Sequence, residues 1–241
     1  MFEDQYLKSL LQFEFIYRII DIKCLLSYMK KSVLSSLDFL PYFTIEAIKQ
    51  LLEDESVADS TILTAVYRWV KAKKIIRLKK GVYMSTRFYE LHHSDAEFSP
   101  MVSAILLPQS YLSLEYILQR QGNLTEITYP VTSITIKQTR MFENQLGTFT
   151  YRNIKADLFI GFNISEYQGI PISKATPAKA LFDYFYLRFW RESDDPVEEL
   201  RLNLEDFTQN DWAEFASFIE ISKSRKMDRI YKNLRRNQWL H

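Results

Sequence analysis

One predicted helical face between residues 61 and 71 carries side chains that could read duplex DNA. At about 100° per residue, four polar residues fall within an arc of roughly 80°, namely Thr61, Thr64, Arg68 and Lys71. Apolar residues occupy the opposite side of the same helix. Hydroxyl groups near the helix start suit base edges or phosphates, and a later arginine suits guanine or the backbone. This pattern is typical of a recognition helix in the major groove.

Basic residues continue beyond this helix, at Lys74, Arg77, Lys79 and Lys80. The chain has no acidic residue between Asp59 and Glu90. Short strands predicted at Ile75–Leu78 and Val82–Met84 enclose a turn at Gly81, which supplies the permissive backbone angle of a hairpin. A basic hairpin can clamp phosphates or enter a minor groove. We therefore predict that the helix and the hairpin together bind double-stranded DNA, with an affinity that falls steeply with salt.

Residues with catalytic potential elsewhere in the chain form weaker patterns. His92 and His93 are adjacent, so on a helix they point about 100° apart and form no i, i+4 metal pair. Cys24 lies in an apolar segment, which favours a structural thiol over a nucleophile. The five glycines are widely spaced and form no phosphate-binding loop. We expect no metal, no cofactor and no enzymatic activity.

A second set of polar residues leaves one alternative open. Glu143, Asp157 and Lys155 are of the types found in metal-dependent nucleases, although their spacing is loose. Asp183 lies among apolar helix residues, and we expect it to be a buried, hydrogen-bonded carboxylate.

The elements that must position the DNA-reading face come first in the chain. Leu25–Leu37 is predicted as the first helix, and Thr44 as the cap of the second. An acidic turn at Glu53–Asp59 precedes the recognition helix, about Ser60–Lys73, which Asp59 or Ser60 is expected to cap. The segment before residue 25 has apolar residues on more than one side, so it either packs on its own chain or forms a homodimer contact.

The second half of the chain predicts a sheet flanked by helices. A helix is expected at Leu112–Arg120, and strands between Ile127 and Ile172, including a short apolar one at Leu158–Phe162. Thr176-Pro177 should start another helix, with proline at its first position. A final amphipathic helix is predicted at about Ser222–Arg236.

These elements predict an α+β protein. Its parts would be an N-terminal helical extension (1–24), a winged helix-turn-helix domain (25–87), and a C-terminal mixed α/β domain (88–241) with an antiparallel-rich sheet and C-terminal helices. Its length of 241 residues suffices for two compact domains. The single cysteine excludes an intrachain disulfide and favours a reducing compartment. We expect no signal peptide and no membrane segment, hence a soluble cytoplasmic protein.

Three runs in the second half resemble a known family. They are SYLSLE at Ser110–Glu115, TRMFENQLGTFTYR at Thr139–Arg152, and ATPAKALFD at Ala175–Asp183. In this order they are similar to the core of the AbiEi family of antitoxins, which are described as predicted transcriptional regulators linked to abortive infection and phage defence. The resemblance covers about Thr44 to the end of the chain.

This resemblance implies a type IV toxin–antitoxin system. The protein would repress its own operon and oppose a nucleotidyltransferase-like toxin without forming a stable complex with it. The family does not fix which residues oppose the toxin. In this sequence the candidates form a second basic set on the predicted strands, at Lys137, Arg140, Arg152 and Lys155, although scattered surface cations would look the same.

Two other functions remain open. The chain could be a standalone winged-helix regulator whose C-terminal domain serves only interaction or dimerisation. It could also be a metal-dependent nuclease that uses Glu143 and Asp157.

Overall fold

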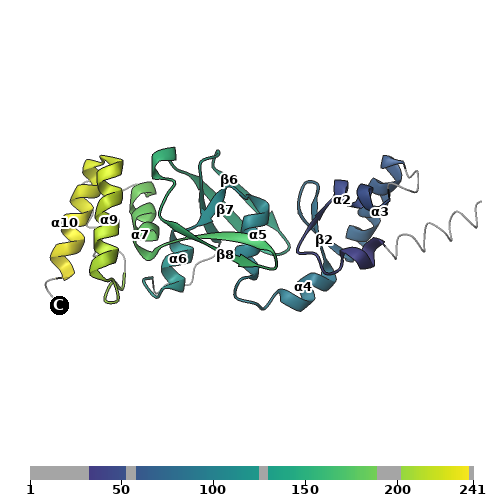
Figure 1. The fold of residues 1–241 in the computed structure, drawn as a ribbon, viewed down its shortest axis with the longest axis horizontal. Helices are drawn as coiled ribbons and strands as arrows, with labels where there is room; N and C mark the ends of the chain where they lie inside the picture. Colours follow the sequence, from purple (N-terminus) through teal and green to yellow (C-terminus); the bar gives the residue numbers. More distant parts are fainter. Residues whose placement is uncertain (1–32, 53–57, 125–129, 189–201, 239–241) are drawn as a thin grey trace, which may run out of the picture. The chain divides into compact units, whose positions relative to one another are not determined.

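The fold is a mixture of helices and β-sheets in a computed structural model of the chain (Figure 1). The structure describes residues 33–52, 58–124, 130–188 and 202–238. The chain divides into two compact units, Met1–Leu91 and His92–His241. The expectations for the segment before residue 25, for Cys24 and for most of the acidic turn lie outside the described residues.

Unit 1 combines helices with a small sheet. After a helical segment at residues 33–37, its elements are β1 (Phe43–Thr44), α2 (Ile45–Leu51), α3 (Asp59–Lys71), β2 (Ile75–Lys79), β3 (Val82–Ser85) and α4 (Thr86–His92). The strands pair antiparallel in the order β1-β3-β2. Ile48 of α2 and Ile62 and Trp69 of α3 are buried in one apolar core, which fixes the two helices against each other.

The starts of α2 and α3 are stabilised in different ways. The Thr44 hydroxyl oxygen accepts a hydrogen bond from the Ala47 amide at 3.2 Å, which confirms the predicted cap. The cap predicted for α3 is wrong, because Ala58 occupies that position and makes no side-chain bond. Asp59 lies inside the first turn instead, where its carboxylate pairs with Lys49 of α2 at 2.7 Å.

The end of α3 has a left-handed residue that is not glycine. Lys73 has a φ of 55°, and its amide donates to the Val70 carbonyl at 3.0 Å. The next amide, of Lys74, donates to the Trp69 carbonyl at 2.9 Å. These two bonds form a Schellman motif, which turns the chain directly into β2.

Unit 2 is built on a six-stranded mixed sheet. Its elements are α5 (Phe98–Leu106), β4 (Ser110–Leu112), α6 (Glu115–Arg120), β5 (Val131–Thr135), β6 (Arg140–Asn144), β7 (Gly147–Asn153), η2 (Ala156–Leu158), β8 (Phe162–Tyr167), β9 (Ile170–Ala175), α7 (Pro177–Leu187), α9 (Gln209–Ser222) and α10 (Arg225–Gln238). The strand order is β6-β7-β5-β4-β9-β8. Three of the five pairings are antiparallel, and β4·β9 and β5·β7 are parallel.

Helices cover both faces of this sheet. On one face, Ser103 of α5 bonds Ser133 of β5 at 3.0 Å and Tyr151 of β7 at 3.1 Å. On the other face, Tyr111 of β4 and Ser113, just after this strand, both donate to Asp183 of α7. Helices α9 and α10 pack beyond α7, on the side away from the sheet (Figure 1).

Two predicted elements in this unit are wrong. The helix expected at Leu112–Arg120 starts only at Glu115, because Ser110–Leu112 pairs with both β5 and β9. The strand expected at Leu158–Phe162 is a 3-10 turn followed by the start of β8, and Leu158 is buried. The predicted start of α7 is confirmed, since Thr176 caps it and Pro177 is its first residue.

No helix in the described ranges combines the length and the apolar character that crossing a bilayer requires.

Candidate nucleic-acid interface

Helix α3 presents two chemically different faces. Ile62, Ala65, Val66 and Trp69 are buried against the core of unit 1. On the other side Thr64, Arg68 and Lys71 are exposed, and Thr61 is half-buried. The helical periodicity therefore places the four predicted DNA-reading residues outside the core, and the cations stand in the last turns of the helix.

The hydroxyl group of Thr64 already donates a hydrogen bond within α3. It donates to the Ser60 carbonyl, one turn earlier, at 2.7 Å. Its oxygen lone pairs remain available, so in this rotamer Thr64 can accept a hydrogen bond from a base amino group but cannot donate to a phosphate.

An exposed aromatic residue on α3 was missed by the sequence prediction. Tyr67 has 66% of its surface exposed, and the neighbouring Leu63 has 52%. On the helix, Tyr67 lies one turn from both Leu63 and Lys71, so it borders the basic face. The helical spacing could have predicted this exposure, because Ile62, Ala65, Val66 and Trp69 already form the buried face and Tyr67 lies outside it. A tyrosine at this position can donate to a phosphate or contact a thymine methyl group.

The hairpin after α3 carries the remaining basic residues. Its strands β2 and β3 meet at Gly81, whose φ of 79° confirms the left-handed position expected there. The register shifts between Arg77 and Lys79, which indicates a bulge in the strand. Lys74, Arg77 and Lys80 are exposed, and Lys79 is half-buried.

Five cations of α3 and the hairpin are not neutralised by other described residues. An ion pair joins Lys49 to Asp59, at the start of α3. Arg68, Lys71, Lys74, Arg77 and Lys80 take part in no ion pair with a described residue. Their charges can therefore compensate phosphates without first breaking an ion pair to a described residue.

The second basic set lies in unit 2 and is divided between the two faces of the sheet. All four residues, Lys137, Arg140, Arg152 and Lys155, are exposed. Arg140 pairs in register with Tyr151, which points toward α5, whereas the next residue, Arg152, points to the α7 face. The Asn153 side chain donates to the Lys137 carbonyl at 2.9 Å, which brings that segment to the end of β7.

The acidic residues considered for a nuclease lie on separate elements. Glu143 pairs with Thr148 near the start of β7, whereas Asp157 follows the other end of that strand, in η2. Neither His92 nor His93 belongs to a metal-binding group, since residues 33–52, 58–124, 130–188 and 202–238 contain no cluster of three His, Cys, Asp or Glu side chains that could hold an ion.

A buried ion pair lies between the sheet and helix α7. The Lys179 ammonium group and an Asp183 carboxylate oxygen are 2.5 Å apart, and both side chains are 0% exposed. The other carboxylate oxygen of Asp183 accepts from Tyr111 at 2.9 Å and from Ser113 at 2.8 Å. The expectation of a buried, hydrogen-bonded Asp183 is confirmed.

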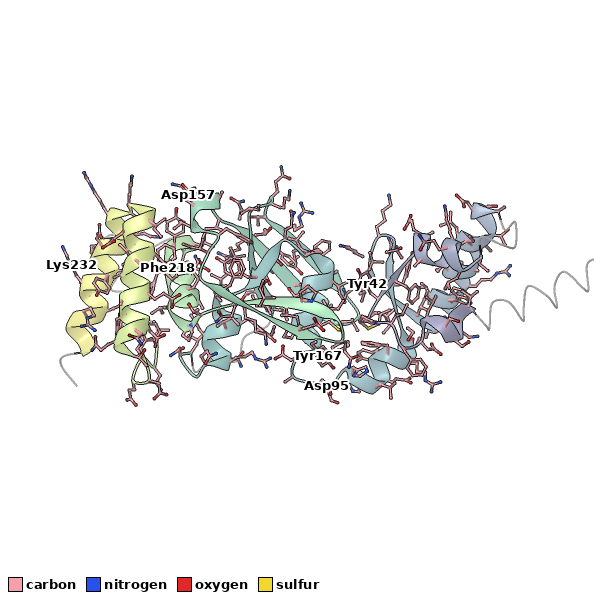
Figure 2. All side chains as sticks on the ribbon, in the orientation of Figure 1. Tyr42, Asp95, Asp157, Tyr167, Phe218 and Lys232 are labelled. Atoms are coloured by element: carbon pink, nitrogen blue, oxygen red, sulfur yellow. The ribbon has the colours of Figure 1, made fainter. Side chains whose placement is uncertain are left out.

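Aromatic rings enclose the lysine of this pair. Its ammonium nitrogen lies 4.8 Å from the ring centre of Phe182 and 5.2 Å from that of Phe218 (labelled in Figure 2), which comes from α9. Burial lowers the pKa of Lys179 and raises that of Asp183, and each partner opposes the shift of the other. Through these contacts the pair links β4, α7 and α9. Because neither side chain is exposed, a substrate cannot reach the pair.

No family model matches the sequence, and a search of curated proteins finds no match.

Proposed function

We propose that the chain is a DNA-binding transcriptional autorepressor and antitoxin of a type IV toxin–antitoxin system. In this proposal unit 1 is a winged helix-turn-helix, with α3 as the recognition helix and the β2–β3 hairpin as the wing. The observation that carries it is the exposed basic face of α3, which makes no ion pair with a described residue and is followed at once by a basic hairpin. Repressors of this class place such a helix in the major groove.

The proposed binding mode gives each part of unit 1 a role. Thr61 and Thr64 approach base edges at the start of α3, and Arg68 reaches a guanine or the backbone. Lys79 and Lys80 contact phosphates from the wing, while Lys71, Lys74 and Arg77 add charge along the same path. The DNA that α3 and the hairpin bind in this proposal is the double-stranded operator upstream of the protein's own gene.

The antitoxin part of the proposal is supported by the resemblance of three runs in unit 2 to the AbiEi family. In this proposal the protein acts in the cytoplasm and opposes a nucleotidyltransferase-like toxin without forming a stable complex with it. The two arms of function then reside in different units, with repression in unit 1 and opposition to the toxin in unit 2.

The DNA-binding face is tested by two alanine variants, Arg68→Ala and Lys80→Ala. Each removes one phosphate or base contact, so we expect roughly a five- to fiftyfold loss of affinity for the upstream promoter duplex. Fluorescence anisotropy at several salt concentrations measures the affinity. If the lost contact is to a phosphate, the slope of log affinity against log salt concentration should decrease by about one.

The matched control is Lys232→Ala, which removes an exposed cation from α10 in unit 2 (Figure 2). It should bind the promoter as the wild type does. If Arg68→Ala and Lys80→Ala also bind like the wild type, α3 and the hairpin are not the DNA-binding face.

A further inference from the structure

A small pocket on unit 2 is lined by two arginines and a glutamate. Its volume is about 210 Å³, and its walls come from the start of α6, from β7 and from the end of α7. The lining residues are Leu114, Glu115, Arg152, Tyr184, Leu187 and Arg188. Neither the DNA-binding face nor the buried Lys179–Asp183 pair contributes to it.

Arg152 reaches this pocket because of the strand register. Tyr111 of β4 is opposite Ile134 of β5, which is opposite Arg152 of β7, so the three side chains share the α7 face of the sheet. The Tyr111 hydroxyl donates to Asp183 of α7, whereas the Arg152 side chain is exposed. The Arg152 side chain makes no hydrogen bond or ion pair with another described residue.

Arg188 is held in position by contacts on both its side chain and its backbone. Its guanidinium group donates to the Tyr184 hydroxyl and lies 5.1 Å from the centre of that ring. Its carbonyl accepts from the Lys226 ammonium group at 3.0 Å, next to two further carbonyls at the end of α7. A guanidinium group fixed in this way loses less freedom when it binds an anion.

One residue that lines the pocket, Leu114, has a strained backbone conformation. It is 3% exposed and has a φ of 60° with a ψ of −143°, a conformation that favours glycine. Backbone of this kind persists only where the surroundings impose it, and it is common at ligand sites. Leu114 turns the chain after β4, and the next residue, Glu115, lines the pocket together with the two arginines.

We propose that this pocket binds a small phosphate monoester that carries hydroxyl groups, such as a sugar phosphate. Two guanidinium groups match a phosphate dianion through paired charged hydrogen bonds. Glu115 repels the phosphate but accepts hydrogen bonds from neighbouring hydroxyls, so it selects the esterified sugar over the free anion. The volume lies below the roughly 300–1,000 Å³ of drug-sized sites, which limits the ligand to a small metabolite.

The test is isothermal titration calorimetry of the full chain, without DNA, using ribose 5-phosphate and inorganic phosphate as probes. We expect saturable, one-to-one binding of ribose 5-phosphate, tighter than that of inorganic phosphate. Arg152→Gln and Arg188→Gln should each weaken it by roughly ten- to a hundredfold, the usual effect of losing a charged hydrogen bond. Glu115→Gln should weaken ribose 5-phosphate by about tenfold and leave inorganic phosphate unchanged or tighter.

The matched control is Arg140→Gln, which removes the same charge from the opposite face of the sheet. It should bind both probes as the wild type does, and thermal unfolding should show that all four variants fold. Absence of saturable binding, equal losses in Arg140→Gln and Arg188→Gln, or equal affinity for the two probes would overturn the proposal. Because no DNA is present, none of these outcomes bears on promoter binding.

Discussion

A single carboxylate, that of Asp95, joins two aromatic side chains at the surface of unit 2. It accepts a hydrogen bond from the Tyr167 hydroxyl and lies 3.1 Å from the Nδ1 atom of His92 (Figure 2 labels Asp95 and Tyr167). The bond from Tyr167 and then that from His92 lower the pKa of Asp95. Burial, followed by the bond to Asp95, raises the pKa of Tyr167 to about 12.

These shifts predict a pH dependence with a definite sign. The folded pKa of Tyr167 lies above the unfolded value near 10, so its contribution to stability is complete below about pH 10 and is lost as pH rises through about 12. The folded pKa of Asp95 is lowered, so its contribution is present above about pH 4 and is lost as pH falls through the folded value.

The measurement is the phenolate absorbance of the wild type minus that of Tyr167→Phe, which isolates this one tyrosine. Its midpoint should lie near pH 12 in the native protein and should fall toward 10 in Asp95→Asn. A midpoint near 10 in the wild type would show that the Tyr167–Asp95 bond does not form.

At the scale of the element, two left-handed residues on either side of β2 should respond oppositely to substitution. Lys73 ends α3 with a φ of 55°, where glycine is preferred, so Lys73→Gly should stabilise unit 1 by up to about 1 kcal/mol. Gly81 has a φ of 79° and open space around it, so Gly81→Ala should destabilise the hairpin by about 1 kcal/mol through its backbone alone.

Urea unfolding of the two variants measures both effects. Lys74→Gly, one residue beyond the left-handed position, is the control and should not stabilise the protein. If Lys73→Gly destabilised unit 1 as much as Lys74→Gly does, the Schellman turn at the end of α3 would not be as described.

Elements whose pattern is local were predictable, and those set by distant partners were not. The period of about 3.6 residues predicts α3 to within two residues at each end. Thr44 and Thr176-Pro177 likewise predict the starts of α2 and α7, because they are typical helix-start residues. Strand β4 was missed because its partners, β5 and β9, are remote in sequence. The turn that separates β4 from α6 was missed because it occurs at an apolar residue, Leu114.

The same distinction holds for functional residues. The exposure of Arg68 and Lys71 follows from helical spacing alone. The burial of Lys179 does not, because it depends on Phe218 of α9 and on Gly161, where an added Cβ would come within 2.5 Å of the Phe218 ring. The joining of Arg152 and Arg188 in one pocket likewise requires the strand register.

For the whole molecule, the proposed function and the division into two units together predict that the proposed repression and the proposed opposition to a toxin can be separated. Arg68→Ala should relieve repression of a promoter–reporter fusion by severalfold, yet it should still restore growth to cells that express the cognate toxin, because it changes unit 1 alone. Growth and reporter output in the same strain measure both. Failure of Arg68→Ala to restore growth at wild-type protein levels would contradict this separation.

The central claim is sequence-specific DNA binding by unit 1, and one comparison tests it most directly. Purified full-length protein is titrated by fluorescence anisotropy against its own upstream promoter duplex and against a shuffled duplex of the same length and composition, at physiological salt. We predict that the promoter binds at least about a thousandfold more tightly. Equal affinity for the two duplexes, or no binding to either, would contradict the claim.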